Sequence, residues 1–258
     1  MSGAHDTAAV ALAESLPPDR GAQESFVSTR KRAVGLFLVL AVAFLGSVVS
    51  SLSQVRGAQH SYPDVLLNLQ YFETLLHQLV SLCLLVYVVR QNRQRLEDLG
   101  LSFRWKDVAH GIILWGITGW SYRLLLPYIV SLCEWLGWHR TPAYLPGSKL
   151  GFGLLTLCFV VVNPVFEELT VRAFLMSETI ALTGNTTLAV LFSFLLQTSY
   201  HLYQGIPYAL ALGLIFLVFS IYYARTRRIF PVLVAHFLAD FLFHLRYILQ
   251  AHAAHGIR

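Results

Sequence analysis

Long charge-poor blocks are the feature of this sequence that most limits what it can fold into. They cover residues 33–53, 72–89, 108–133, 188–200, 208–224 and 229–249. Most approach the roughly 20 residues that a helix needs to cross about 30 Å of hydrocarbon. Only 13% of the chain is charged, whereas about a quarter of a soluble domain is charged. These blocks predict an all-α fold, a polytopic bundle of about seven to eight transmembrane helices.

Basic clusters predict how the chain is threaded through the membrane. They lie at residues 30–32, 90–95 and 225–228, each beside a charge-poor block. Because basic loops stay on the cytoplasmic side, we expect a multi-pass protein of the cell membrane with a cytoplasmic N-terminus. Seven spans place all three basic clusters on the cytoplasmic side, provided that residues 150–183 cross the membrane once. The Asn-Pro pair at residues 163–164 could instead divide that stretch into two spans or make it a re-entrant half-helix.

The chain before the first block differs from the rest in composition. Residues 1–32 are rich in Ala, Ser, Pro and charge and contain no apolar run. We expect them to form a disordered cytoplasmic tail, and residues 33–258 to form the membrane domain. The net charge is +5, but the basic residues fall mostly in short loops, where they act as topology signals. We therefore expect the lipid bilayer, and no nucleic acid, as a partner.

Two adjacent glutamates and an arginine stand inside the 150–183 stretch. Glu168 and Arg172 are four residues apart, so on a helix they share a face and can pair. Glu167 points about 100° away from that face and is free to contact another segment. This pattern gives one carboxylate held by a cation and one spare carboxylate. Taken alone, it is also typical of an ordinary ion pair at a helix end.

Histidines mark the two segments that follow. His201 comes directly after the fourth block, and His236 lies with Asp240 inside the last one. The i,i+4 spacing puts the His236 ring and the Asp240 carboxylate on one helix face, where Asp240 can accept a hydrogen bond from a ring N–H. Ionisable groups inside a membrane are costly and usually face the bundle interior. A lone histidine at a membrane boundary is more often structural, so only the combination of motifs points to chemistry.

Together the motifs resemble the signature of the CAAX-processing and bacteriocin-processing (CPBP) family of intramembrane endopeptidases, which includes the type II CAAX prenyl endopeptidases. That signature reads EExxxR, then FxxxH, then HxxxN or HxxxD. The first motif is complete at residues 167–172, and the third is complete at His236 and Asp240. The second differs, because Gln197 stands where phenylalanine is expected before His201. The resemblance covers roughly residues 97–250.

The resemblance implies a catalytic role for each motif. Glu167, with His201, would activate a water molecule for attack on a peptide carbonyl. His236 and Asp240 would hold the developing oxyanion. An ionised aspartate only accepts hydrogen bonds. We therefore expect Asp240 to orient and charge His236, which then donates alone.

From this resemblance we predict a glutamate-type intramembrane endopeptidase. It would hydrolyse a peptide bond of a membrane-associated or lipidated protein or peptide, as in CAAX-type or sorting-tail processing, with Glu168 and Arg172 as a supporting pair. No cofactor is expected. The alternative is a zinc metalloprotease with His201, His236 and Glu167 as ligands, although the helical HExxH spacing typical of zinc is absent from the sequence.

Two other functions remain open. One is a catalytically silent scaffold or binding protein with the same fold, and the other is an ion-coupled transporter. The complete set of catalytic residue types favours the enzyme over the scaffold, and the lack of a visible internal repeat counts against an inverted-repeat transporter. A site also requires its histidines to meet. Counted along their helices, His236 lies about 10 Å and His201 about 20 Å from the cytoplasmic face, so a tilt, or a break near Gly184-Asn185, must bring them together.

Overall fold

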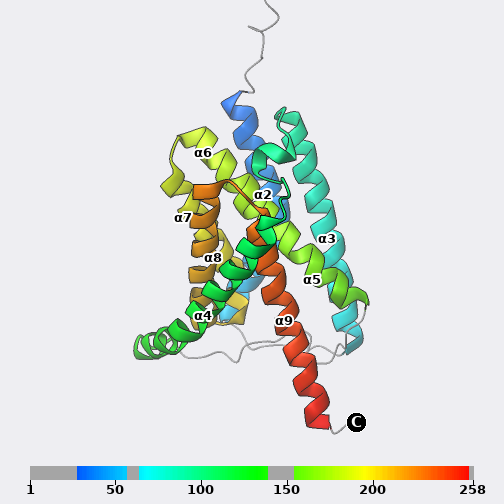
Figure 1. The fold of residues 1–258 in the computed structure, drawn as a ribbon, viewed down its shortest axis with the longest axis vertical. Helices are drawn as coiled ribbons and strands as arrows, with labels where there is room; N and C mark the ends of the chain where they lie inside the picture. The colour runs from blue at the N-terminus through cyan, green and yellow to red at the C-terminus, as the bar shows by residue number, and fades with distance from the viewer. Residues whose placement is uncertain (1–27, 57–63, 139–153, 256–258) are drawn as a thin grey trace, which may run out of the picture.

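The computed structural model describes residues 28–56, 64–138 and 154–255, and every regular element in these ranges is helical (Figure 1). This confirms the predicted all-α class. The α-helices of the described ranges, in chain order, are α2 (Thr29–Arg56), α3 (Asp64–Gln91), α4 (Lys106–Trp135), α5 (Leu154–Glu167), α6 (Ser177–Thr183), α7 (Thr186–Tyr200), α8 (Ile206–Thr226) and α9 (Phe230–His255). The predicted tail, residues 1–32, lies mostly outside the described ranges. Its last residues differ from the prediction, because α2 already begins at Thr29 and so includes Arg30, Lys31 and Arg32.

Four helical stretches of the described chain are long and apolar enough to cross a membrane: Thr29–Val55, Leu69–Gln91, Leu154–Thr183 and Ile206–Thr226. Helix α7 is apolar but shorter. Helices α4 and α9 are long, but polar residues such as Arg123 and Asp240 interrupt their apolar runs. The multi-pass membrane bundle is therefore confirmed. The predicted seven to eight spans exceed these four, because the prediction also counted the segments of α4, α7 and α9.

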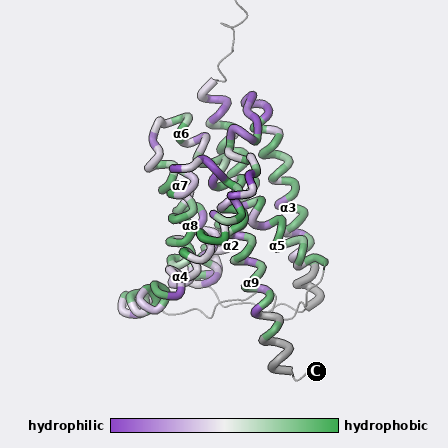
Figure 2. The backbone as a smooth tube through the Cα atoms, in the orientation of Figure 1, coloured by the Kyte–Doolittle hydropathy of each residue, from purple (hydrophilic) through white to green (hydrophobic). Residues whose placement is uncertain are grey.

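The outer surface of the bundle is apolar. Phe37, Trp135 and Leu154 are 75%, 81% and 78% exposed, and many other large apolar side chains also point outward. A surface patch of this size is not stable in water, but it matches the hydrocarbon of a bilayer. Figure 2 shows mostly hydrophobic residues along the helices and hydrophilic residues gathered where α2 begins and α3 ends.

The basic clusters lie at that same hydrophilic end and are fixed there by hydrogen bonds. Lys31 donates from Nζ to the carbonyl of Gln91 at 3.1 Å. Arg32 binds both carboxylate oxygens of the buried Glu178, at 2.8 and 2.9 Å. On the turn between α8 and α9, Arg228 contacts the buried Asp107 at 2.6 Å. The clusters that the positive-inside rule assigns to one side of the membrane therefore share one end of the bundle.

The stretch that could have been broken at Pro164 is one continuous helical run. Helix α5 passes through Pro164 and is followed directly by a π-helical segment, Glu168–Met176, and then by α6. Proline removes one backbone donor and crowds the preceding turn, and a wider turn begins four residues later. Single π-helical turns occur often at functional sites. Every residue of this π-helical segment is buried, so its two charged side chains lie inside the protein.

Two glycines allow the helices around this segment to approach closely. A Cβ at Gly111 of α4 would lie 2.5 Å from the side chain of Val234 in α9, and one at Gly213 of α8 would collide with Thr198 of α7. Small residues at helix contacts are typical of membrane bundles, since they let backbones come together. These contacts hold α4 against α9 and α7 against α8. Helix α9 carries His236, and His201 directly follows α7.

Candidate functional site

Glu168, Arg172 and His236 form a buried charged centre. Arg172 donates to Glu168 Oε1 at 2.8 Å, and neither side chain is exposed, so the predicted i,i+4 pair is present. The same oxygen accepts a hydrogen bond from His236 Nδ1 at 2.6 Å. Because an ionised carboxylate can only accept, the proton of this bond belongs to Nδ1. The bond therefore fixes the tautomer of His236 and leaves Nε2 facing the rest of the site.

Aromatic rings of α8 surround the Arg172 guanidinium. Its Cζ lies 5.0 Å from the ring centroid of Phe216 and 5.6 Å from that of Phe219. Arg172 also donates to the carbonyl oxygen of Phe216 at 3.4 Å. Cation–π contacts are strongest where water is excluded. Arg172 is thus held by a carboxylate, a carbonyl and two rings, which replace part of its hydration, while its Nε has no hydrogen-bond partner among the described residues.

The contact between His236 and Asp240 differs from the predicted one. Both side chains share a face of α9, but His236 Nε2 lies 3.7 Å from Asp240 Oδ1, which is longer than a good hydrogen bond. Glu168 makes the shorter contact to the ring, so it is the main orienting group. Asp240 instead accepts a hydrogen bond from Asn163 Nδ2 at 3.2 Å, and Asn163 Oδ1 accepts from Gln78 Nε2 at 2.7 Å.

Glu167 faces away from this centre and toward α7, as its position on the helix predicts. Its Oε2 accepts from Tyr200 Oη at 2.7 Å and from Gln197 Nε2 at 3.1 Å. His201 Nε2 lies 3.9 Å from the same oxygen. Gln197, which replaces the phenylalanine of the second motif, therefore has a direct polar role at Glu167.

Helix α2 holds the donor Tyr200 in place. The Tyr200 ring stacks on Phe44, with 4.9 Å between centroids and 10° between ring planes. The carbonyl oxygen of Tyr200 accepts from Ser51 Oγ at 2.6 Å. Orientation of the Glu167 carboxylate thus depends on a helix far from it in the sequence.

The two histidines meet at the ring of Phe216. His201 stacks on it with 5.1 Å between centroids and 25° between planes, and the His236 ring centroid lies 5.9 Å from it. The expected helix break is present: Gly184 has a positive φ of 68° and ends α6, and Asn185 caps α7 by accepting from the backbone N–H of Leu188. The site is therefore assembled from the predicted residues in spite of their different calculated depths.

Four residues of the site were not singled out from the sequence: Gln78, Asn163, Tyr200 and Phe216 as partners of the catalytic motifs. Gln78 had a usable signal, since it is a polar residue in an otherwise apolar block. The only sequence signal at Asn163 is its place in the helix-breaking pair Asn163-Pro164. Tyr200 and Phe216 carry no signal of their own in an aromatic-rich membrane sequence.

The residues proposed as zinc ligands are not arranged as a metal site. Within the described ranges, no group of three or more His, Cys, Asp or Glu side chains is placed to hold a metal ion. His236 uses Nδ1 for Glu168, and Glu167 Oε2 accepts from Tyr200 and Gln197.

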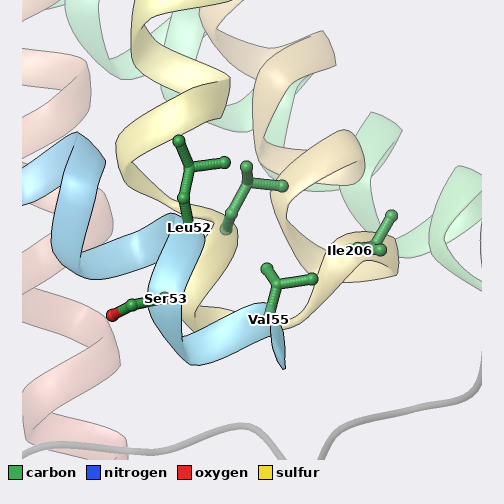
Figure 3. Close-up of a pocket in the computed structure, with 5 residues that line it drawn as sticks. Leu52, Ser53, Val55 and Ile206 are labelled. Carbon is green, nitrogen blue, oxygen red and sulfur yellow. The ribbon is translucent and has the colours of Figure 1, made fainter. Parts of the chain in front are cut away.

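An apolar pocket lies next to the site. Leu52, Ser53, Val55, Leu202 and Ile206 line it, at the end of the bundle where α2 ends and α8 begins (Figure 3). Leu202 directly follows His201 in the chain. The pocket itself contains none of the catalytic candidates, but it places an aliphatic surface one residue away from the second motif.

Residues 149–242 match the family model described as type II CAAX prenyl endopeptidase Rce1-like. The matched range contains all three motifs, from Glu167 to Asp240. No curated protein and no solved structure gives a significant match. The match supports a membrane peptidase of the CAAX type.

The buried charged centre should contribute strongly to stability. Arg172→Met removes the cation and leaves Glu168 buried without its ion-pair partner, so we expect a loss of about 3–5 kcal/mol in the free energy of unfolding. The matched control is Arg95→Met at the surface pair with Glu97, whose side chains are 79% and 59% exposed; its loss should stay below about 1 kcal/mol. Denaturant unfolding in detergent, followed by tryptophan fluorescence, measures both. Equal losses would contradict the assignment of this centre as a stabilising element.

Proposed function

We propose that this chain is an endopeptidase of the CPBP type that cleaves a membrane-associated or lipidated protein or peptide, as the match of residues 149–242 to the type II CAAX prenyl endopeptidase Rce1-like model supports. The observation that carries the proposal is the placement of Glu167 opposite His201, with 3.9 Å between Oε2 and Nε2, next to the buried His236. A scaffold needs no such convergence of a carboxylate and two histidines in an apolar interior, where each is costly.

Glu167 and His201 are the groups that activate water. Their separation is too long for a direct hydrogen bond, and a water molecule that contacts both is polarised from two sides. Glu167 takes one proton from this water, and the water oxygen attacks the carbonyl carbon of the scissile bond. The carbonyl electron pair moves to its oxygen. When the tetrahedral species collapses, the C–N bond breaks and the proton passes from Glu167 to the leaving amine, so that one acid and one amine are formed.

The remaining polar residues position these groups. Tyr200 and Gln197 donate to one oxygen of Glu167, which orients the carboxylate and leaves its other oxygen for water. Glu168 holds His236, whose Nε2 can donate to the oxyanion when the ring is charged. Preorganised donors of this kind each contribute a few kcal/mol to stabilisation of the transition state.

The apolar pocket beside His201 favours a hydrophobic substrate. Its walls are formed mainly by Leu52, Val55, Leu202 and Ile206 (Figure 3). A lipid chain or an aliphatic side chain placed there would leave water and bring the adjacent peptide bond to the site. This is consistent with a prenylated or other lipidated substrate, and a fluorogenic peptide with a prenylated cysteine is the appropriate probe.

Glu167→Gln should abolish cleavage of this peptide while the protein stays folded. Glutamine keeps the volume of the side chain and can still accept from Tyr200, but it cannot take a proton from water. The control is Glu73→Gln on the exposed face of α3, which should leave the rate unchanged. Peptide cleavage by the purified variants is the measurement. Wild-type rates in Glu167→Gln would remove this residue from the mechanism and favour a binding protein with the same fold.

We propose that the reaction proceeds without a metal, because no group of three or more His, Cys, Asp or Glu side chains among the described residues is placed to hold one. Activity should then persist after prolonged chelation, and elemental analysis of the purified protein should give well below one zinc per chain. The contrary outcome is about one zinc per chain, with activity lost on chelation and restored by added zinc. That result would make His201 and His236 ligands.

We also propose that the hydrophilic end of the bundle faces the cytoplasm, which makes the N-terminus cytoplasmic. The support is the gathering of the basic clusters at that end. In a chain without its three native cysteines, Arg95→Cys should react with a membrane-impermeant thiol reagent only after the cells are permeabilised. Gln54→Cys, near the opposite end of α2, should react in intact cells. The reverse pattern would overturn the proposed orientation.

A further inference from the structure

Asp240 leaves the site without one donor that the HxxxN form of the third motif provides. An amide at this position has N–H groups that can donate to an oxyanion, whereas an ionised carboxylate accepts only. A carboxylate close to a developing oxyanion also repels it. An amide donor to the oxyanion must therefore come from another residue in this chain.

Asn163 brings an amide to the place where position 240 lacks one. It lies four residues before Glu167 on α5, so the two side chains share a helix face. Its Nδ2 is 3.2 Å from Asp240 Oδ2, and Asp240 is one turn from His236 on α9. The amide thus stands one helical turn before Glu167 in α5 and is bonded to a residue one turn after His236 in α9.

Two contacts fix the orientation of this amide. Gln78 Nε2 donates to Asn163 Oδ1 at 2.7 Å, which turns the amide oxygen toward α3. Asp240 accepts from Nδ2, which turns the NH2 group toward α9. A side-chain amide carries two N–H donors. Asp240 takes one, and within the described residues the other has no protein partner. Asn163 is also only partly buried, so a substrate can reach it.

We propose that Asn163 is a further catalytic residue, whose second Nδ2–H donates to the oxyanion of the tetrahedral species. This rests on the proposed peptidase function. The electron pair displaced from the carbonyl double bond stays on the oxygen, which accepts hydrogen bonds from Asn163 and His236, and no proton is transferred to it. Asp240 is a positioning residue, since it acts by holding the amide. Compared with the HxxxN form of the third motif, the amide stands on α5 at Asn163, and a carboxylate takes its place on α9 at Asp240.

Asn163→Ala tests this directly. Removal of one oxyanion donor should lower kcat about 10²–10³-fold and leave KM nearly unchanged. The double variant Asn163→Ala/Asp240→Asn places an amide at position 240, and its kcat should recover at least about tenfold over Asn163→Ala. A purely structural role of Asn163 would not be rescued in this way. Asn92→Ala is the matched control, because Asn92 is a buried asparagine at the hydrophilic end, and its kcat should equal that of the wild type.

The isosteric exchange protects the test against misfolding. Asn163→Asp alone should be as impaired as Asn163→Ala, whereas Asn163→Asp/Asp240→Asn keeps both side-chain volumes and their hydrogen bond and should be active. Circular dichroism and thermal unfolding in detergent identify any variant that does not fold.

The outcomes separate this inference from the proposed function. If the wild type cleaves the prenylated peptide and Glu167→Gln does not, the peptidase function stands. A kcat for Asn163→Ala or Asn163→Asp within about threefold of the wild type would then overturn the role of Asn163, as would a failure of Asp240→Asn to rescue. A wild type no faster than Glu167→Gln overturns the peptidase function and this inference together.

Discussion

Burial of an ion pair inside the membrane bundle is the constraint on which the rest of the structure depends. Glu168 and Arg172 are both fully buried, and removing two charges from water costs several kcal/mol per ion unless every contact is good. The protein compensates with a second donor to the carboxylate, from His236, and with the carbonyl and ring of Phe216 on the guanidinium. Helices α8 and α9 therefore have to pack around the π-helical segment in one register, and this same register brings His236 to the site.

The local part of this arrangement follows from the sequence. The pairing of Glu168 with Arg172, the opposite direction of Glu167 and the shared face of His236 and Asp240 all result from helical spacing, which the chain determines over a single turn. Contacts between helices could not be predicted in that way. The bonds from Gln197 to Glu167 and from Asn163 to Asp240 depend on crossing angles and depths, and these are set by packing, including the close approaches at glycines. The His236–Asp240 distance of 3.7 Å is an example, because the shorter contact of the ring is to Glu168 on another helical segment.

Segments outside the family match complete the site. The match begins at residue 149, yet α2 supplies the stacking of Phe44 on Tyr200 and the bond from Ser51, and α3 supplies Gln78. Arg32 links α2 to the helical run of the first motif through Glu178 at the hydrophilic end. The N-terminal helices are thus not merely additional membrane anchors. They fix the orientation of two side chains that contact catalytic candidates, so a change in their packing would reach the site.

The partners of the two adjacent glutamates account for their different roles. Glu168 is bound to a permanent cation and to a histidine N–H, both on one oxygen, so protonating it would leave Arg172 buried without a counter-charge. Glu167 is held by two neutral donors, Tyr200 and Gln197. Protonation of Glu167 therefore leaves no buried arginine without its ion-pair partner. Two carboxylates that are neighbours in the chain therefore have different surroundings, one paired with a buried cation and the other placed for the proton transfer with water that the proposed mechanism requires.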